Sequence, residues 1–199
     1  MIFQQDHLYH VYNRSIARRK VFVNYGNYIY FLKKTRKNLL PHCRILAYCL
    51  MPDHFHLMVY VDCLEISIED MSGNMKKRTL NQSIGILLRS YTNALQNQEK
   101  FTGSLFQQHT KSICLTEPKG ITPAYFETVF GARINVLPNE KEYPQFCFDY
   151  IHNNPVKAGL VAAADQWEFS SAKDYCGIRN GKLPDKNLAE KLGITFRHK

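Results

Sequence analysis

The sequence of 199 residues predicts an α+β fold, in which an antiparallel β-sheet carries helices on one face and a C-terminal extension of helices and loops follows. Two observations predict it. Four short runs combine apolar residues with alternation or β-branched and aromatic side chains, which favours strands. Two longer segments repeat their apolar residues every three or four positions, which is typical of helices. The predicted order is strand, helix, strand, strand, helix, strand.

The first predicted strand covers residues 7–13, where His-Leu-Tyr-His-Val-Tyr-Asn alternates enough for a strand. A basic loop over residues 14–20 follows it. Asn24 or Asn27 can cap a helix through residues 28–37, because an asparagine side chain accepts a hydrogen bond from the first turn. The lysines and arginines of this helix form a cationic outer surface.

A β-hairpin is predicted next, with strands at residues 43–50 and 54–61. Met51-Pro52-Asp53 forms its turn, because proline presets φ at the second turn position and aspartate can bond its own backbone.

Residues 62–74 are acidic and irregular, and a loop or a short helix is expected there. The second long helix is predicted over residues 81–98. Its evidence is the helical spacing of Ile84, Leu87, Leu88, Tyr91 and Leu95. After a turn at Gly103, residues 109–115 are expected to form the fourth strand.

The rest of the chain is expected to be less regular. Prolines and glycines punctuate residues 116–139, which predicts a loop-rich insertion with a short helix near residues 124–130. The later elements are a short helix at residues 144–153 that Asn153-Asn154-Pro155 ends, an aromatic docking segment at residues 166–175, and a surface helix at residues 186–192.

This order is the β-α-β-β-α-β arrangement of the ferredoxin-like fold. The length favours a single domain overall, with a core at residues 1–115, an insertion at residues 116–143 and an extension at residues 144–199 that docks on the core. Such a fold serves many functions, so function must come from particular residues.

Composition narrows the class of protein. An apolar share of 45% is typical of globular domains, and the sequence has neither a long apolar run nor an evident signal peptide. The six cysteines form no C-x-x-C pair, so we expect reduced thiols in a cytoplasmic protein. The net charge of +9 favours a polyanionic partner, most simply nucleic acid, although a merely basic soluble protein would have the same charge.

His54 and His56 are the first candidate site residues. On a strand they point to one face while Phe55 points to the other. Two imidazoles about 7 Å apart along a strand can converge on one metal ion. As a bare pattern, His-x-His on a strand more often marks two ordinary histidines on a half-exposed face, so a metal site needs a further ligand and a nucleophile over the same face.

Tyr91 is the candidate nucleophile, since it lies in the second strong helix. A core aromatic is the alternative. A tyrosine hydroxyl has a pKa near 10 and needs a polarised electrophile or a base to attack. Gln96 and Asn93 are nearby amides that can assist a metal, whereas Leu95, four residues after Tyr91, cannot.

Several blocks in order resemble the HUH single-tyrosine transposases of the REP-associated type, the transposase-17 group. The blocks are Tyr9-His-Val-Tyr-Asn-Arg14, Leu50-Met-Pro-Asp-His-Phe-His-Leu-Met58, Leu88-Arg-Ser-Tyr-Thr92, Gly103-Ser-Leu-Phe-Gln107, Tyr150-Ile-His-Asn-Asn-Pro-Val-Lys-Ala-Gly-Leu-Val161 and Trp167-Glu-Phe-Ser-Ser171.

The resemblance implies a metal-dependent transposase that cleaves and rejoins single-stranded DNA. His54 and His56 match the pair that holds one divalent ion, Mg²⁺ or Mn²⁺. Tyr91 matches the nucleophile, which forms a 5′-phosphotyrosine and frees a 3′-hydroxyl near a hairpin or palindromic repeat. Gln96 matches a further metal ligand. Relatives occur as monomers and as homodimers, so both states stay open.

The basic residues supply the expected DNA surface: Arg14, Arg18, Arg19, Lys20, Lys76, Lys77, Arg78, Arg89 and Lys111. Tyr12 or Phe106 can stack on bases. The family block Gly-Arg-Phe-Lys is replaced here by Gln108-His-Thr-Lys111, which lacks its arginine. Such departures also fit a non-catalytic, domesticated nucleic-acid-binding protein, and a structural zinc protein is a third, weaker interpretation.

Overall fold

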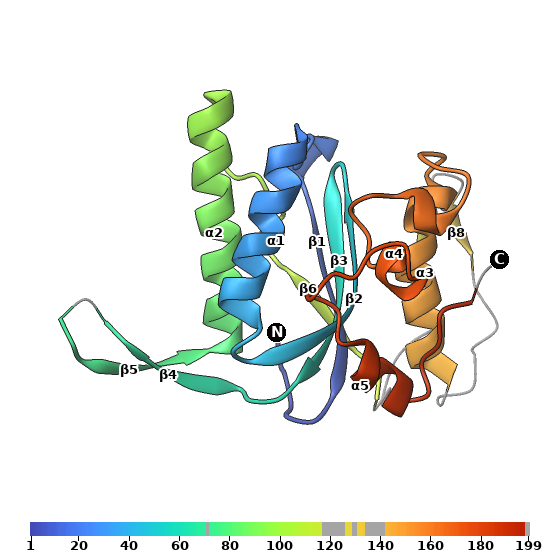
Figure 1. Ribbon diagram of the computed structural model, residues 1–199. Coiled ribbons are helices and arrows are strands. Elements are labelled where there is room, and N and C mark those ends of the chain that lie inside the picture. The colour runs from blue at the N-terminus through green and yellow to red at the C-terminus, as the bar shows by residue number, and fades with distance from the viewer. Residues whose placement is uncertain (71, 117–125, 129–130, 134–141, 198–199) are drawn as a thin grey trace.

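The architecture was determined from a computed structural model, which describes the chain except residues 71, 117–125, 129–130, 134–141 and 198–199 (Figure 1). The strands are β1 (Leu8–Arg14), β2 (Cys43–Met51), β3 (His54–Val61), β4 (Glu65–Glu69), β5 (Met75–Thr79), β6 (Lys111–Cys114), β7 (Phe126–Thr128) and β8 (Gly131–Arg133). The helices are α1 (Tyr25–Leu39), α2 (Leu80–Glu99), α3 (Tyr143–Lys157), α4 (Ala172–Tyr175) and α5 (Lys186–Lys191), with 3-10 turns at Ile16–Arg18 and Ala164–Gln166.

The central sheet has the strand order β2-β3-β1-β6, and each neighbouring pair is antiparallel. Helices α1 and α2 cover one face of it (Figure 1). The predicted α+β fold with ferredoxin-like order is therefore confirmed, and the predicted hairpin of β2 and β3 is present, with a shift of register between Ile45 and Ala47.

Local sequence explains where the two core helices begin. The side chain of Asn24 accepts a hydrogen bond from the backbone N–H of Asn27, and the side chain of Asn27 bonds back to Asn24. Thr79 and Gln82 form the same reciprocal pair at the start of α2. Such capping boxes satisfy backbone donors that a helix end otherwise leaves unpaired.

The C-terminal segment covers the opposite face of the sheet. Helix α3 packs there with α4 and α5 beside it (Figure 1). Phe148 and Ile151 of α3 join Leu46, Met58 and other buried side chains in a second hydrophobic cluster. The sheet is thus sandwiched between two layers, and helices lie on both of its faces once the extension is included.

Three predictions about local structure were wrong. The described residues of the range 62–74, all but residue 71, contain no helix; β4 and β5 instead form a two-stranded hairpin that projects from the body (Figure 1). Helix α3 does not end before Pro155 but continues to Lys157, with Pro155 buried inside it. Of the helix expected at residues 124–130, Phe126–Thr128 is strand, and residues 124, 125, 129 and 130 lie outside the described residues.

Within the described part of the chain, no helix is both long enough and apolar enough to cross a membrane.

Candidate functional site

The strand β3 places His54 and His56 on the sheet face that α3 covers. Phe55 and Leu57 point the other way, into the core beneath α1 and α2. Across the sheet, Arg14 is opposite His54 and Tyr12 is opposite His56. The two imidazole rings lie with their centroids 5.0 Å apart, so the two side chains are adjacent on this face.

Asp53, in the turn before β3, orients His54. Its Oδ1 lies 2.5 Å from Nδ1 of His54. This hydrogen bond is the main reason why the pKa of Asp53 is lowered. Because Nδ1 is engaged, the imidazole presents Nε2 to the space beside His56. A carboxylate behind a histidine in this way is the usual arrangement at metal sites.

His56 is deeply buried, with an exposed fraction of 5%. Its Nδ1 lies 2.8 Å from Nε2 of His10 on β1, whereas its own Nε2 has no hydrogen-bond partner among the described residues. Burial, above all, lowers the pKa of His56 well below its usual value and that of His10 to about 3. Both rings are therefore neutral near pH 7, the state in which imidazole binds metals.

Tyr150 of α3 lies against these histidines. Its ring centroid is 5.5 Å from that of His56 and 6.1 Å from that of His10. Burial raises the pKa of Tyr150, while a hydrogen bond from the side chain of Asn154 and the charge of Arg14 lower it. Lys157, two turns along α3, places Nζ 5.2 Å from the centre of the Tyr150 ring.

Asn154 follows Tyr150 by one helical turn, so both project from the same side of α3. The Nδ2 of Asn154 donates to the carbonyl oxygen of Tyr150 at 3.0 Å. An amide is thereby held beside the phenol, on the helix face that is turned to the histidines.

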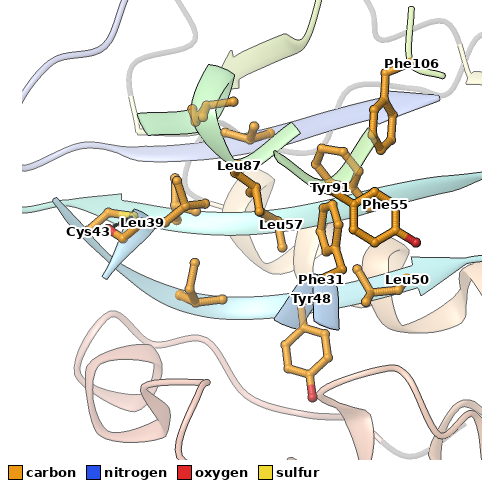
Figure 2. Packing of buried hydrophobic residues seen from close by; sticks show 14 of the residues in the cluster. Phe31, Leu39, Cys43, Tyr48, Leu50, Phe55, Leu57, Leu87, Tyr91 and Phe106 are labelled. Carbon is orange, nitrogen blue, oxygen red and sulfur yellow. Dashed lines mark hydrogen bonds between the residues drawn. The ribbon is translucent and has the colours of Figure 1, made fainter. Parts of the chain in front are cut away.

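The structure does not bring Tyr91 to the histidines. Tyr91 is 1% exposed and lies in the core between α2 and the opposite sheet face, packed on Phe31 (Figure 2). Its hydroxyl donates to the carbonyl oxygen of Val21 at 2.8 Å. The expectation that Tyr91 completes the site is therefore contradicted, and the core interpretation of this residue holds.

Gln96 is also away from the histidines, because it belongs to the same helix, α2. Its Nε2 donates to the carbonyl oxygen of Gly103 at 2.7 Å. The expectation that it is a metal ligand fails for the same reason as that of Tyr91: the whole helix lies on the other side of the sheet.

The predicted basic residues divide into three groups. Arg14 and Lys111 lie near the histidines, the latter with Nζ 5.9 Å from the centre of the Tyr12 ring. Arg18, Arg19 and Lys20 lie in the loop that follows β1, where they are exposed. The remaining ones are remote from α3: Lys76, Lys77 and Arg78 on the projecting strand β5, and Arg89 on the outer side of α2.

Of the two aromatics expected to stack on bases, only Tyr12 suits that role. It is partly exposed, beside His56 and Lys111. Phe106 is buried in the α1 and α2 core and contacts Phe55 there.

Sequence reasoning missed Tyr150, Asn154 and Lys157 as site residues. A signal for them was present, because a tyrosine and an amide four residues apart on a helix share one face, whereas Tyr91 has Leu95 at that spacing. The spacing therefore favours Tyr150 over Tyr91.

Comparison with known families supplies the context for this arrangement. The model of the IS200-like transposases matches residues 3–113, which is more than half of the chain and includes His10, His54 and His56. The chain belongs to the IS200-like transposase family. This IS200-like transposase is therefore related to proteins that act in DNA transposition.

Among solved structures, the fold is similar to that of a REP-associated tyrosine transposase bound to a REP hairpin. The TM-score is 0.56, the sequences are 16% identical, and the alignment covers 89% of this chain and 83% of the other. The agreement therefore extends beyond the family match into the C-terminal layer. A search of curated proteins gives no match.

Proposed function

We propose that this transposase cleaves single-stranded DNA next to a hairpin through a covalent bond to Tyr150. The observation that carries the proposal is the contact of the Tyr150 ring with His56, at 5.5 Å between centroids, with Asn154 one turn further along the helix. A nucleophile, an amide and two imidazoles thus share one side of the sheet.

His54 and His56 would hold a divalent ion, with the Asn154 amide as a further oxygen ligand. The unpartnered Nε2 of the buried His56 and the orientation of His54 by Asp53 fit this role. Among the residues that the structure describes, no three His, Cys, Asp or Glu side chains gather as a metal cluster, so an amide or solvent would complete the coordination. When bound, the ion acts as a Lewis acid on a phosphate oxygen, and imidazoles favour Mn²⁺ over Mg²⁺.

Tyr150 performs the chemical step in this proposal. Its phenolic oxygen forms a bond to phosphorus, and the bond from phosphorus to the 3′-oxygen breaks. The phenol gives up its proton, and the freed 3′-oxygen takes up a proton to become the 3′-hydroxyl. Arg14 and Lys157 supply positive charge near Tyr150, which favours the approach of a phosphate group. The phosphotyrosine conserves the bond energy for rejoining, so no external energy source is needed.

The decisive experiment compares Tyr150→Phe with Tyr91→Phe. Each protein is incubated with hairpin-bearing oligonucleotides and Mn²⁺, and adducts that survive denaturation are separated on gels. We expect the wild type and Tyr91→Phe to form an adduct and Tyr150→Phe to form none. An adduct with Tyr150→Phe would refute the assignment, and DNA binding without any adduct, unchanged by a chelator, would favour a non-catalytic nucleic-acid-binding protein.

We further propose that each site is built within one chain, as the contact between Tyr150 and His56 supports. A mixture of Tyr150→Phe and His56→Ala tests this. If the nucleophile and the histidines come from the same chain, the mixture stays inactive. Adduct formation by the mixture would instead show that two chains of a homodimer share their sites.

A further inference from the structure

The hydrogen bond between His10 and His56 is a feature that the proposed reaction does not yet use. His10 lies on β1, two residues before Tyr12, which is opposite His56 in the register. Nε2 of His10 therefore reaches Nδ1 of His56 diagonally across the two strands, at 2.8 Å. Both side chains are buried, so water does not compete readily for this bond.

The distance between the two nitrogens restricts where the proton is. Two nitrogens at 2.8 Å must share one hydrogen, because two N–H groups repel and two bare nitrogens have nothing to share. Either His10 donates, and the neutral His56 then carries its hydrogen on Nε2, or His56 donates from Nδ1 and its Nε2 is bare.

The two arrangements differ in whether Nε2 of His56 carries a hydrogen, and the surroundings of this atom favour one of them. This atom is buried and has no hydrogen-bond partner within the described part of the chain. A hydrogen there would be a buried donor without an acceptor, and it would also occupy the lone pair that binds a metal. With the hydrogen on Nδ1, Nε2 instead presents its lone pair to the space beside His54.

Two rings hold His10 in place for this contact. The Tyr12 ring stacks on His10 with 4.7 Å between centroids and 27° between planes. The Tyr150 ring meets His10 edge-on from another side, at 6.1 Å and 73°. The position of His10 is thus fixed by packing, as expected for a group that orients another side chain.

We propose that His10 is a positioning residue that accepts the Nδ1 hydrogen of His56 and so leaves Nε2 of His56 bare to bind a divalent cation. Asp53 does the same for His54, so each imidazole of the pair has its own acceptor behind it. This inference rests on the proposed function, because it assumes that the pair binds a metal.

The test measures Mn²⁺ binding to the full-length protein by electron paramagnetic resonance or calorimetry, without DNA. His10→Phe keeps a buried ring but has no acceptor, and we expect its Kd to rise about 10-fold to 100-fold. His10→Gln offers an amide oxygen at a similar reach and should restore most of the affinity. His42→Phe is the matched control, since His42 is a fully buried imidazole bonded to Ser83 and remote from the pair.

A spectroscopic readout covers the case in which His10→Phe does not fold. In ¹⁵N spectra of the wild type loaded with Mg²⁺, we expect the hydrogen of His56 on Nδ1 and none on Nε2. A hydrogen on Nε2 in the loaded protein, or a Kd of His10→Phe within twofold of the wild type, would overturn the inference alone. A wild type that binds neither ion would overturn both this inference and the proposed metal site.

Discussion

Replacing Tyr91 by Phe removes one oxygen atom from the core and should destabilise the protein without affecting catalysis. The side chain is 1% exposed, and its hydroxyl donates to the carbonyl oxygen of Val21 at 2.8 Å. The ring stays, so its packing on Phe31 and Phe22 is kept and no large cavity forms. The cost is the lost hydrogen bond together with a carbonyl group left without its donor, about 1–2 kcal/mol of unfolding free energy.

For a chain of this length, a loss of that size lowers the Tm by about 2–8 °C. Thermal and urea unfolding measure it, and Tyr25→Phe, whose side chain is 62% exposed, is the matched control that should leave the Tm unchanged. At a temperature well below the transition, Tyr91→Phe should form the DNA adduct at the wild-type rate. An unchanged Tm combined with loss of the adduct would refute the placement of Tyr91 in the core.

Three further outcomes follow from the structure. Burial lowers the pKa of His42, so the imidazole is protonated in the unfolded chain at a higher pH than in the folded protein. The free energy of unfolding therefore falls as the pH drops below about 6.5. Urea unfolding at pH 7.5 and 5.5 should show a smaller fall in His42→Gln than in the wild type. Arg179→Met leaves the 1% exposed carboxylate of Asp174 without its ion pair at 2.7 Å, which should cost about 3–5 kcal/mol, measured by urea unfolding, and Asp174→Asn in the same chain should recover part of it. Gly85→Ala should stabilise α2 by about 0.5–1 kcal/mol, because an added Cβ meets nothing within 4 Å, and an unchanged or lowered Tm would contradict this.

The sheet and its two core helices were predictable because local and global signals agree. The Pro52-Asp53 turn joins two apolar strands, and the apolar side chains of α2 recur at helical intervals and are buried. The hairpin of β4 and β5 was also recognisable in principle, since Glu65-Ile-Ser-Ile-Glu69 alternates strictly, but its acidic residues suggested a loop. Alternation of apolar and polar residues is a strand signal even in a largely exposed segment with acidic side chains on its polar face.

Helix α3 could not be bounded from local rules. The residue before a proline usually avoids the helical conformation, and a proline inside a helix costs about 3 kcal/mol. Pro155 nevertheless lies within α3 and is buried, as are Phe148 and Ile151, which pack on the sheet. Burial against the sheet outweighs the local penalty of the proline. This burial cannot be predicted from the sequence until the sheet face that the helix covers is known.

The choice between the two tyrosines follows from chirality and alternation together. The crossovers from β1 through α1 to β2 and from β3 through α2 to β6 both join parallel strands, and right-handed crossovers place both helices on the same face. That face must be the one with Phe55 and Leu57, so the histidines occupy the other face. A residue on the buried side of α2 cannot reach them through the sheet. A nucleophile carried by a helix must therefore come from the C-terminal layer on the histidine face, and Tyr150 of α3 satisfies this condition with its ring 5.5 Å from His56.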